Sequence, residues 1–309
     1  MLTLRTFFNH QLPIMSKVFI VTLLVFSSMS TWAQQYSMSL GVFTGTTVSF
    51  TNDEGINKDP RYKGRYELKF APIGVNFGMD YERFGFMVSP GLINVGQNFY
   101  VVNTVGGQEG LRKINLKYLN IPATVKVHLL NLSFFKFSAL ASISASYLLD
   151  GKDVVSHNAT KLTFSPAVYP ILPPGYEVQY DGVKVPAVDN YVINSKEDYR
   201  SMQVFIAAGF RSDWDVSDHW RVSFDFRVNY GLFDPRNDAY IAKLNTNSTL
   251  YDLPGSRRDM FAQLTFGISR YLDFEKGDVE RAKNLKGNHK LYKPKKFPGQ
   301  KIRSSRPKG

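Results

Sequence analysis

The sequence predicts an all-β protein: an eight-stranded antiparallel transmembrane β-barrel followed by a disordered basic C-terminal tail. The strongest observation is the segment 220–232, WRVSFDFRVNYGL, in which apolar and aromatic residues alternate strictly with polar residues and glycine. Such alternation is typical of a β-strand with one apolar and one polar face. The polar face carries the full charges of Arg221, Asp225 and Arg227. We therefore expect the apolar face to contact lipid and the polar face to line the interior.

Two further observations support a barrel. Similar alternation recurs in eight segments, namely 36–50, 65–81, 84–102, 113–129, 135–149, 199–216, 220–232 and 258–274. Their connections alternate between long and short, as in outer-membrane barrels with long outer loops and short periplasmic turns. The body of the chain has no run of about 20 apolar residues that could form a transmembrane helix. A soluble eight-stranded barrel, with polar residues facing outward, is the alternative fold.

The second and third predicted strands are less regular than the first. A polar loop, 51–64, follows the first strand. In the second strand the alternation slips by one residue near Ala71 and Pro72, which predicts a β-bulge. The phase of the third strand also blurs, near residues 93–95.

The last five predicted strands alternate more regularly, and two long segments interrupt them. The fourth and fifth strands are joined by a short turn, and the longest insertion, 150–198, follows the fifth. This insertion contains five prolines. The sixth and seventh strands are joined by another short turn, and a polar loop, 234–257, precedes the eighth. An even number of strands leaves both ends of the barrel on the periplasmic side.

The ends of the chain differ from its body in composition. Residues 1–33 are predicted to be a signal peptide, in which Lys17 precedes a short apolar run and a cleavage site of small residues; Met15 is a second candidate for the true start. Residues 34–274 form the predicted barrel. Residues 275–309 carry twelve lysines and arginines against three acids, and these account for +9 of the net charge of +12. Proline and the lack of alternation predict a disordered periplasmic tail.

The basic tail is either a solvated extension or an electrostatic tether to an anionic partner in the envelope. The cations that would form the tether are Lys290, Lys293, Lys295, Lys296, Lys301, Arg303, Arg306 and Lys308. We expect the tail and the insertion 150–198 to be the parts that bind a periplasmic or envelope protein, while the barrel surface contacts outer-membrane lipid. Nucleic acid is not expected as a partner, because the excess positive charge is confined to the tail of an exported chain.

The predicted barrel interior is rich in charge. The inward positions hold Asp80, Lys126, Lys136, Arg211, Asp213, Arg221, Asp225 and Arg227. An eight-stranded barrel is about wide enough inside for its own side chains. Because both signs of charge are present, we expect a network of salt bridges and hydrogen bonds that plugs the lumen. The alternative is a narrow selective pore.

The sequence offers little catalytic chemistry. It contains no cysteine and no cofactor-binding motif, so no cofactor or metal is expected. His157, beside Ser156, is the only histidine expected on the outer side of the barrel. An enzyme at the outer rim would need a nucleophile, a base and an orienting group in contact. Asp53 and Glu54 are expected in a solvated loop rather than in a calcium site, which needs more oxygen ligands.

The run 117–126, KYLNIPATVK, resembles a strand of the PorT-like outer-membrane barrels of Bacteroidetes, and the segments 86–91 and 266–269 fit the same pattern. Asn120 stands where an acid is common in that family. The resemblance covers residues 34–274 and implies an eight-stranded outer-membrane barrel. The namesake of the family belongs to the type IX protein secretion and gliding machinery.

Together these observations predict a non-enzymatic outer-membrane barrel that acts as a structural or interaction component of the cell envelope. A role in a type IX secretion or gliding complex is implied by the resemblance alone, since the matching residues place strands and specify no substrate. The alternatives are a porin-like pore for small solutes and an enzyme that modifies lipids of the outer leaflet.

Overall fold

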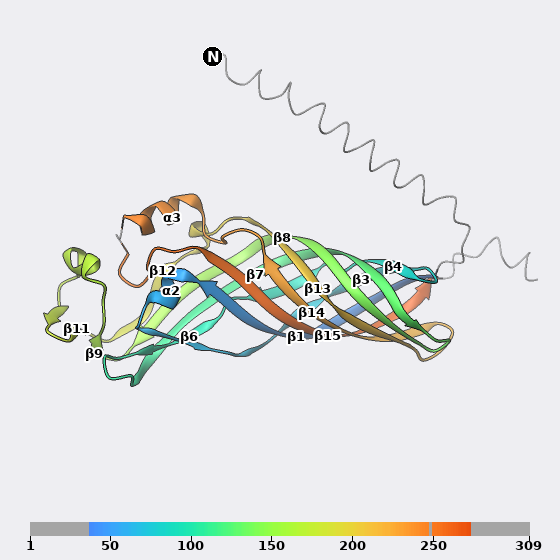
Figure 1. Ribbon diagram of the computed structural model, residues 1–309, viewed down its shortest axis with the longest axis horizontal. Coiled ribbons are helices and arrows are strands. Elements are labelled where there is room, and N and C mark those ends of the chain that lie inside the picture. Colours follow the sequence, from blue (N-terminus) through green and yellow to red (C-terminus); the bar gives the residue numbers. More distant parts are fainter. Residues whose placement is uncertain (1–36, 247–248, 273–309) are drawn as a thin grey trace, which may run out of the picture. The chain divides into compact units, whose positions relative to one another are not determined.

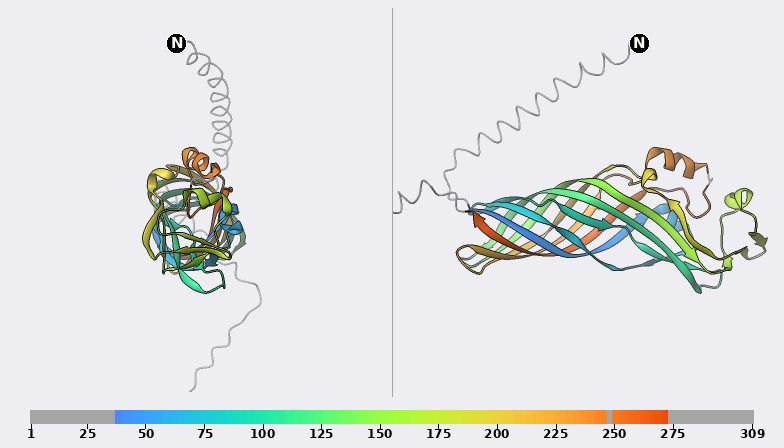
Figure 2. Two further views of the ribbon diagram at one scale, coloured as in Figure 1. Left: turned by 90° about the vertical axis from the view of Figure 1, so that its left-hand side faces the viewer. Right: turned by 180° about the vertical axis from the view of Figure 1, so that it is seen from behind.

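The computed structural model describes residues 37–246 and 249–272. Within these residues, antiparallel strands close into a ring of eight, which confirms the predicted fold class (Figures 1 and 2). The ring consists of β1 (Ser37–Asp53), β3 (Leu68–Asp80), β4 (Phe84–Val88) continued by β5 (Gly91–Val95), β7 (Gln108–Asn131), β8 (Phe135–His157), β13 (Met202–Asp215), β14 (Trp220–Gly231) and β15 (Arg257–Leu272). Pairing of β15 with β1 closes the ring. The predicted signal peptide 1–33 and tail 275–309 lie outside the described residues.

The strands are staggered around the ring. Following paired residues once around the barrel from Trp220 leads back to Tyr230 on the same strand, a stagger of ten residues. A stagger of this size in eight strands requires the strands to tilt by roughly 40° from the barrel axis. The interior is then about wide enough for side chains alone.

Two β-bulges explain where the sequence alternation changes phase. In β3, one extra residue lies between the pairs Thr44–Ile73 and Thr46–Phe70, which confirms the bulge predicted near Pro72. In β8, a second bulge lies near Leu149, where the register with β7 shifts. After this second bulge the odd-numbered residues of β8 face inward, and β8 continues to its end at residue 157. The predicted end of this strand at residue 149 was therefore too early.

The outer surface of the ring is apolar. On β14 every side chain from Arg221 to Asn229 at an odd position is buried, whereas Phe224, Phe226 and Val228 are exposed. This arrangement is the reverse of a soluble barrel and rules out that alternative. The other ring strands show the same arrangement, with exposed Leu40, Val42, Ile73, Val75, Leu119, Ile121, Val125, Val127, Ile143, Ile206, Leu264 and Ile268.

Exposed aromatic rings lie at both edges of the apolar surface. At the short turns they are Phe86, Phe134, Trp214 and Trp220, and toward the long loops they are Phe50, Tyr66, Phe70, Tyr147, Tyr230 and Phe233. The ten residues from Trp220 to Tyr230, at about 3.3 Å each and a tilt of about 40°, correspond to a height of about 25 Å. This height and the two aromatic girdles match the lipid-facing band of outer-membrane barrels. We call the two ends of the barrel the turn end and the loop end; the loop end is the extracellular one in barrels of this kind.

The connections at the loop end are folded, and we call them together the cap. They contain α2 (Glu54–Lys58), β2 (Tyr62–Arg65), β6 (Asn98–Val102), β9 (Thr160–Leu162), η1 (Pro166–Ile171), β10 (Glu177–Gln179), β11 (Gly182–Val185), β12 (Val188–Asn194), η2 (Lys196–Asp198) and α3 (Asp238–Asn245). In Figure 1 these elements gather at the left end of the barrel, opposite the short turns. No helix in the described part of the chain is both long and apolar enough to cross a bilayer.

Two apolar clusters account for the buried core. The first lies inside the ring toward the loop end and comprises Ile56, Ile93, Val95, Phe99, Ile114, Leu116, Tyr118, Leu148, Tyr199, Phe205 and Phe261. The second lies at the loop end, where it joins the cap to β8 of the ring. It comprises Val101, Val155, Leu162, Phe164, Val168, Val183, Val185, Leu250 and Tyr251. The barrel thus has an apolar surface against lipid and a separate apolar core inside its outer half.

Candidate functional site

A network of buried charges fills the interior near the turn end. Asp80 of β3 accepts hydrogen bonds from Lys126 of β7 and from Arg221 of β14, and it thereby links three strands across the lumen. The Nε2 atom of His128 lies 3.7 Å from the Asp80 carboxylate. The side chains of Asp80, Lys126 and Arg221 are each 1% exposed. Because an unpaired buried charge costs several kcal/mol, these three charges depend on one another.

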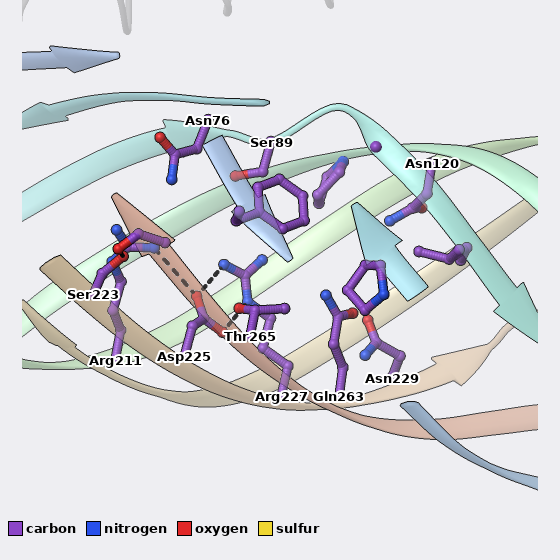
Figure 3. A pocket seen from close by; sticks show the side chains of 16 residues that line it. Asn76, Ser89, Asn120, Arg211, Ser223, Asp225, Arg227, Asn229, Gln263 and Thr265 are labelled. Atoms are coloured by element: carbon purple, nitrogen blue, oxygen red, sulfur yellow. Dashed lines mark hydrogen bonds and ion pairs between the residues drawn. The ribbon is translucent and has the colours of Figure 1, made fainter. Parts of the chain in front are cut away.

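A second layer of charges lies next to the first, farther from the turn end. Arg211 Nε donates to Asp213 Oδ1 at 2.8 Å, and Arg227 Nε donates to Asp225 Oδ1 at 2.7 Å. An ion pair of 3.5 Å between Arg211 and Asp225 connects the two pairs (Figure 3). Arg227 also donates to Thr124 Oγ1 at 3.0 Å and so reaches β7. This layer fixes β13, β14 and β7 relative to one another.

Seven of the eight side chains predicted for the lumen lie in these two layers, and Lys136 does not. Lys136 is half-buried and forms no ion pair with any residue that the structure describes. Asp215 joins the network instead: its Oδ1 accepts from Arg221 Nε at 2.9 Å and from the Tyr271 hydroxyl at 2.6 Å. Asp215 follows Asp213 by two residues, so the alternation of β13 could have revealed it. The resulting network balances four cations, Lys126, Arg211, Arg221 and Arg227, with four carboxylates, Asp80, Asp213, Asp215 and Asp225.

A small polar cavity lies beside the second layer of charges (Figure 3). Its lining includes Asn76, Ser89, Asn120, Arg227 and Gln263. The free space holds about one or two water molecules. The buried Ser89 hydroxyl has no partner among the described residues, and a water molecule here would supply one. The cavity is too small for an organic ligand.

The first apolar cluster closes the lumen on the other side of this cavity. Phe205 of β13 lies edge-to-face against Tyr118 and Phe261, with ring centroids 6.0 Å and 5.3 Å apart. All three rings are at most 1% exposed. Aromatic side chains packed in this way fill the lumen at this level. The sequence did not predict this layer. Here both the inward and the outward side chains of the strands are apolar, so the alternation between apolar and polar residues that identifies the inner face is missing.

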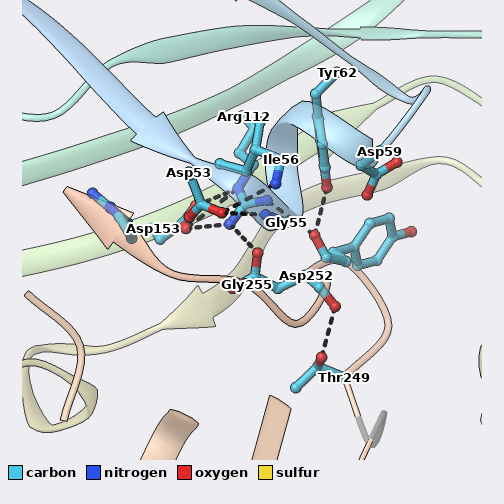
Figure 4. A network of polar contacts seen from close by, with 12 residues as sticks. Asp53, Gly55, Ile56, Asp59, Tyr62, Arg112, Asp153, Thr249, Asp252 and Gly255 are labelled. Atoms are coloured by element: carbon cyan, nitrogen blue, oxygen red, sulfur yellow. Dashed lines mark hydrogen bonds and ion pairs between the residues drawn. The ribbon is translucent and has the colours of Figure 1, made fainter. Parts of the chain in front are cut away.

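A second charged network lies at the loop end, between the ring and the cap (Figure 4). Arg112 of β7 is at its centre: its Nη2 lies 2.7 Å from Asp153 and 3.1 Å from Asp252, and its Nη1 donates to the Tyr251 carbonyl oxygen at 3.1 Å. The Asp252 carboxylate also accepts from the Tyr240 hydroxyl of α3 at 3.0 Å. The segment that contains Tyr251 and Asp252 is thus tied to the barrel wall and to a cap helix.

Arg236 extends this network to the start of the first cap connection. It contacts Asp234 at 2.9 Å, Asp53 at 3.5 Å and Asp252 at 3.7 Å, and its side chain is fully buried. Asp53 was expected in a solvated loop, and this prediction is wrong. Its carboxylate is buried because it caps the N-terminus of α2, accepting from the backbone N–H groups of Gly55 and Ile56. Glu54 is exposed, as expected.

His157 is held in a chain of hydrogen bonds in the cap. Its Nδ1 donates to the Asn158 carbonyl oxygen at 2.8 Å, so the Nε2 of the neutral ring accepts from the Tyr251 hydroxyl at 2.9 Å. Tyr251 in turn accepts from the Tyr176 hydroxyl at 2.7 Å. Ser156 points elsewhere and bonds with Asp189 at 3.3 Å. Among the hydrogen bonds of the described residues, none therefore joins Ser156 to the His157 imidazole.

Burial also affects the phenols of the cap. It raises the pKa of Tyr251 and of Tyr240 well above the usual value for a phenol, because the phenolate form would lose its hydration. Within residues 37–246 and 249–272, no group of three or more histidine or acidic side chains is placed to hold a metal ion. The cations predicted for the basic tail lie outside the described residues.

Comparisons with solved structures give distant likenesses to outer-membrane proteins. The outer membrane protein OprG of Pseudomonas aeruginosa is 9% identical, with 77% of this chain and 97% of that chain covered and a TM-score of 0.40. The attachment invasion locus protein Ail of Yersinia pestis is 12% identical, with 77% and 99% covered and a TM-score of 0.31. The comparison with curated protein sequences gives no match.

The family comparison is more informative. Residues 32–235, more than half of the chain, match the family described as outer membrane protein beta-barrel domain. The match includes the first seven ring strands and the cap up to the segment before α3. Together with the closed ring and its apolar outer surface, it places the protein in the outer membrane. The chain belongs to the family of outer membrane protein beta-barrel domains.

Proposed function

We propose that this protein is a closed, non-conducting and non-enzymatic barrel that serves as a structural or interaction component of the cell envelope. The observation that carries this proposal is the filled lumen. Going from the turn end to the loop end, the interior holds the balanced ionic network, the small polar cavity, the apolar cluster and the charged network beneath the cap. A solute would have to break several buried ion pairs and separate packed aromatic rings to pass.

The non-enzymatic role is supported by the surroundings of His157, the one histidine at the loop end among the described residues. Both ring nitrogens of His157 are occupied by structural hydrogen bonds. Its hydroxyl partner, Tyr251, also bonds Tyr176 and lies within the second apolar cluster. This group joins the cap to the barrel, and its packing leaves no room for a lipid substrate to reach the imidazole.

The finer proposal is that the barrel works within a type IX secretion or gliding complex. Its support is the resemblance of residues 117–126 to the PorT-like barrels, together with two features suited to protein contact. One is the predicted basic tail, 275–309, which would face the periplasm. The other is the part of the cap within the insertion 150–198, which projects at the loop end as a separate three-stranded sheet, β10–β11–β9.

The experiment that tests an interaction role is affinity capture after mild detergent extraction. The full chain is compared with a chain truncated after Phe274 and with a full chain in which Lys293, Lys295, Lys296 and Lys301 are changed to glutamine. Capture of the same envelope proteins by the full chain, with loss in both variants, is the expected result. If neither the full chain nor the variants capture a defined protein, an interaction role through the tail is contradicted.

A further inference from the structure

The outer wall of the barrel becomes basic where the apolar band ends at the loop end. The outward side chains of β7 are apolar from Val127 to Leu119. The next outward positions are Lys117, Asn115 and Lys113, and both lysines are exposed. Lys117 is two residues beyond Leu119, the last apolar residue of the band, which corresponds to about 7 Å along the strand. It therefore lies just outside the hydrocarbon region of the membrane.

The neighbouring strand β8 shows the same change. Its Tyr147 pairs with Leu119 and is 49% exposed, which places an aromatic ring at the membrane interface beside the end of the apolar band. Beyond it, the exposed Lys152 pairs with Asn115. Lys152 is therefore the diagonal neighbour of both Lys113 and Lys117 on the same face of the sheet.

The strands on the other side of β7 extend this basic surface. Asn98 of β6 pairs with Lys113, and Arg65 of β2 pairs with Asn98. The Arg65 guanidinium lies 5.5 Å from the centre of the Tyr100 ring, and the exposed Lys63 pairs with Tyr100. The basic wall patch, as we call it, thus consists of Lys63, Arg65, Lys113, Lys117 and Lys152.

Two acids face the basic wall patch and leave it with an excess of three positive charges. Asp150 lies 3.6 Å from Lys117, and both side chains are more than half exposed. An ion pair exposed to this extent contributes little, so Lys117 remains available to another anion. Glu67 accepts a hydrogen bond from the Asn98 amide. Across the barrel, Arg258 of β15 is instead bonded to the Leu232 carbonyl oxygen.

We propose that the basic wall patch binds the phosphate groups of a glycolipid in the outer leaflet. Its position carries the proposal: the cations begin immediately beyond the aromatic girdle, at the depth of lipid headgroups. Long lysine side chains can lie along the apolar wall and present their ammonium groups to phosphates at this depth. The charge excess matches a ligand that carries more than one negative charge. A lipid held there would cover one side of the barrel and orient it toward its neighbours in the membrane.

The test uses the full chain reconstituted into phosphatidylcholine vesicles that contain a minor fraction of bisphosphorylated lipid A. Lipid that stays bound after mild detergent extraction is identified by native mass spectrometry. Matched vesicles contain dephosphorylated lipid A. The variant Lys113→Gln/Lys117→Gln/Lys152→Gln is compared with Lys58→Gln/Lys184→Gln/Lys196→Gln, which removes the same charge from exposed positions in the cap. A third variant, Asp150→Asn, removes an acid from the patch and so changes its charge in the opposite direction.

The proposal predicts selective retention of the phosphorylated lipid by the unchanged chain and by the cap variant. Retention should fall about fivefold for each patch lysine removed. It should rise in Asp150→Asn, and this gain cannot be attributed to misfolding. The proposal is overturned if phosphorylated and dephosphorylated lipid are retained equally, if the patch variant retains as much as the unchanged chain, or if the cap variant loses retention to the same extent.

Discussion

Arg112 and Asp252 are 140 positions apart in the chain, and Arg112 Nη2 lies 3.1 Å from Asp252 Oδ1. Both side chains are 1% exposed. The pair connects β7, a strand of the barrel wall, to the segment that precedes β15. Because Asp252 also accepts from Tyr240 of α3, one carboxylate joins the wall and the cap at the loop end. Stability of the cap is therefore coupled to that of the barrel wall.

Removing this carboxylate should loosen the cap. In Asp252→Ala the buried Tyr240 hydroxyl loses its acceptor, and Arg112 retains Asp153 as its remaining carboxylate partner. We expect a loss of about 3 kcal/mol in the free energy of unfolding. Hydrogen exchange should increase in the segment around residues 246–256 before it increases in the ring strands. Asp252→Asn keeps the shape and an acceptor oxygen and should lose less; unchanged exchange in the alanine variant would contradict the role of this pair.

The charge balance near the turn end can be tested by a double-mutant cycle. Asp80→Asn leaves Lys126 and Arg221 buried without their shared carboxylate and should destabilise the barrel by about 3–5 kcal/mol. Because Asp80→Asn leaves the network with one cation in excess, adding Lys126→Met restores its charge balance, and we expect part of the lost stability to return. The measurement is urea unfolding of the barrel in vesicles, followed by tryptophan fluorescence. Additive effects of the two changes would show that the residues are not coupled.

The assignment of the apolar outer face to lipid predicts a cost that depends on depth. Leu264→Arg places a charge near the middle of the apolar band, because Leu264 pairs with Phe226, between Trp220 and Tyr230. We expect a loss of about 2–4 kcal/mol in unfolding free energy. Val216→Arg, at a position by a short turn that is also exposed (68%, against 55% for Leu264), should cost at most about 1 kcal/mol. Equal costs at the two positions would contradict the placement of the membrane.

The cap should lose stability in alkaline solution. Burial raises the pKa of the Tyr240 and Tyr251 phenols, so the unfolded cap releases these protons at a lower pH than the folded cap. Their effect on stability is absent below about pH 10, the usual phenol pKa, and stability falls as the pH rises above it. Absorbance at the phenolate band, measured together with limited proteolysis of the cap, follows the transition. Tyr251→Phe should weaken the pH dependence, whereas Tyr180→Phe, at a fully exposed position, should leave it unchanged.

The sequence contained enough information for the ring of strands. The alternation of residues 220–232 predicts which side chains of β14 face lipid, and the slip near Pro72 predicts the bulge of β3. Both signals are local, because alternate residues of a strand lie on opposite faces. The same rule places Asp80, Lys126 and Arg221 in the interior. The alternation rule does not reveal which of these side chains form ion pairs. Asp80 accepts a hydrogen bond from Arg221, which lies 141 positions away in the chain.

The cap could not be predicted in the same way. Arg112, Asp153 and Asp252 come from three separate parts of the chain, and none of them belongs to a local motif. The bulge near Leu149 reverses the phase of β8, so the sequence pattern predicts a loop at Asp153 and His157, which instead face inward from a strand. Polar residues in a loop are expected to face water. Here they are buried because arginines from distant strands supply their partners.

The most direct test of the closed lumen is a single-channel recording from the purified full chain in a planar lipid bilayer. Correct insertion is verified by the heat-dependent gel mobility of the barrel, and an established open porin serves as the positive control. A filled interior predicts no current steps above the background of the bilayer at moderate voltage. Regular, reproducible current steps from the inserted barrel would contradict the closed lumen and favour a small-solute pore.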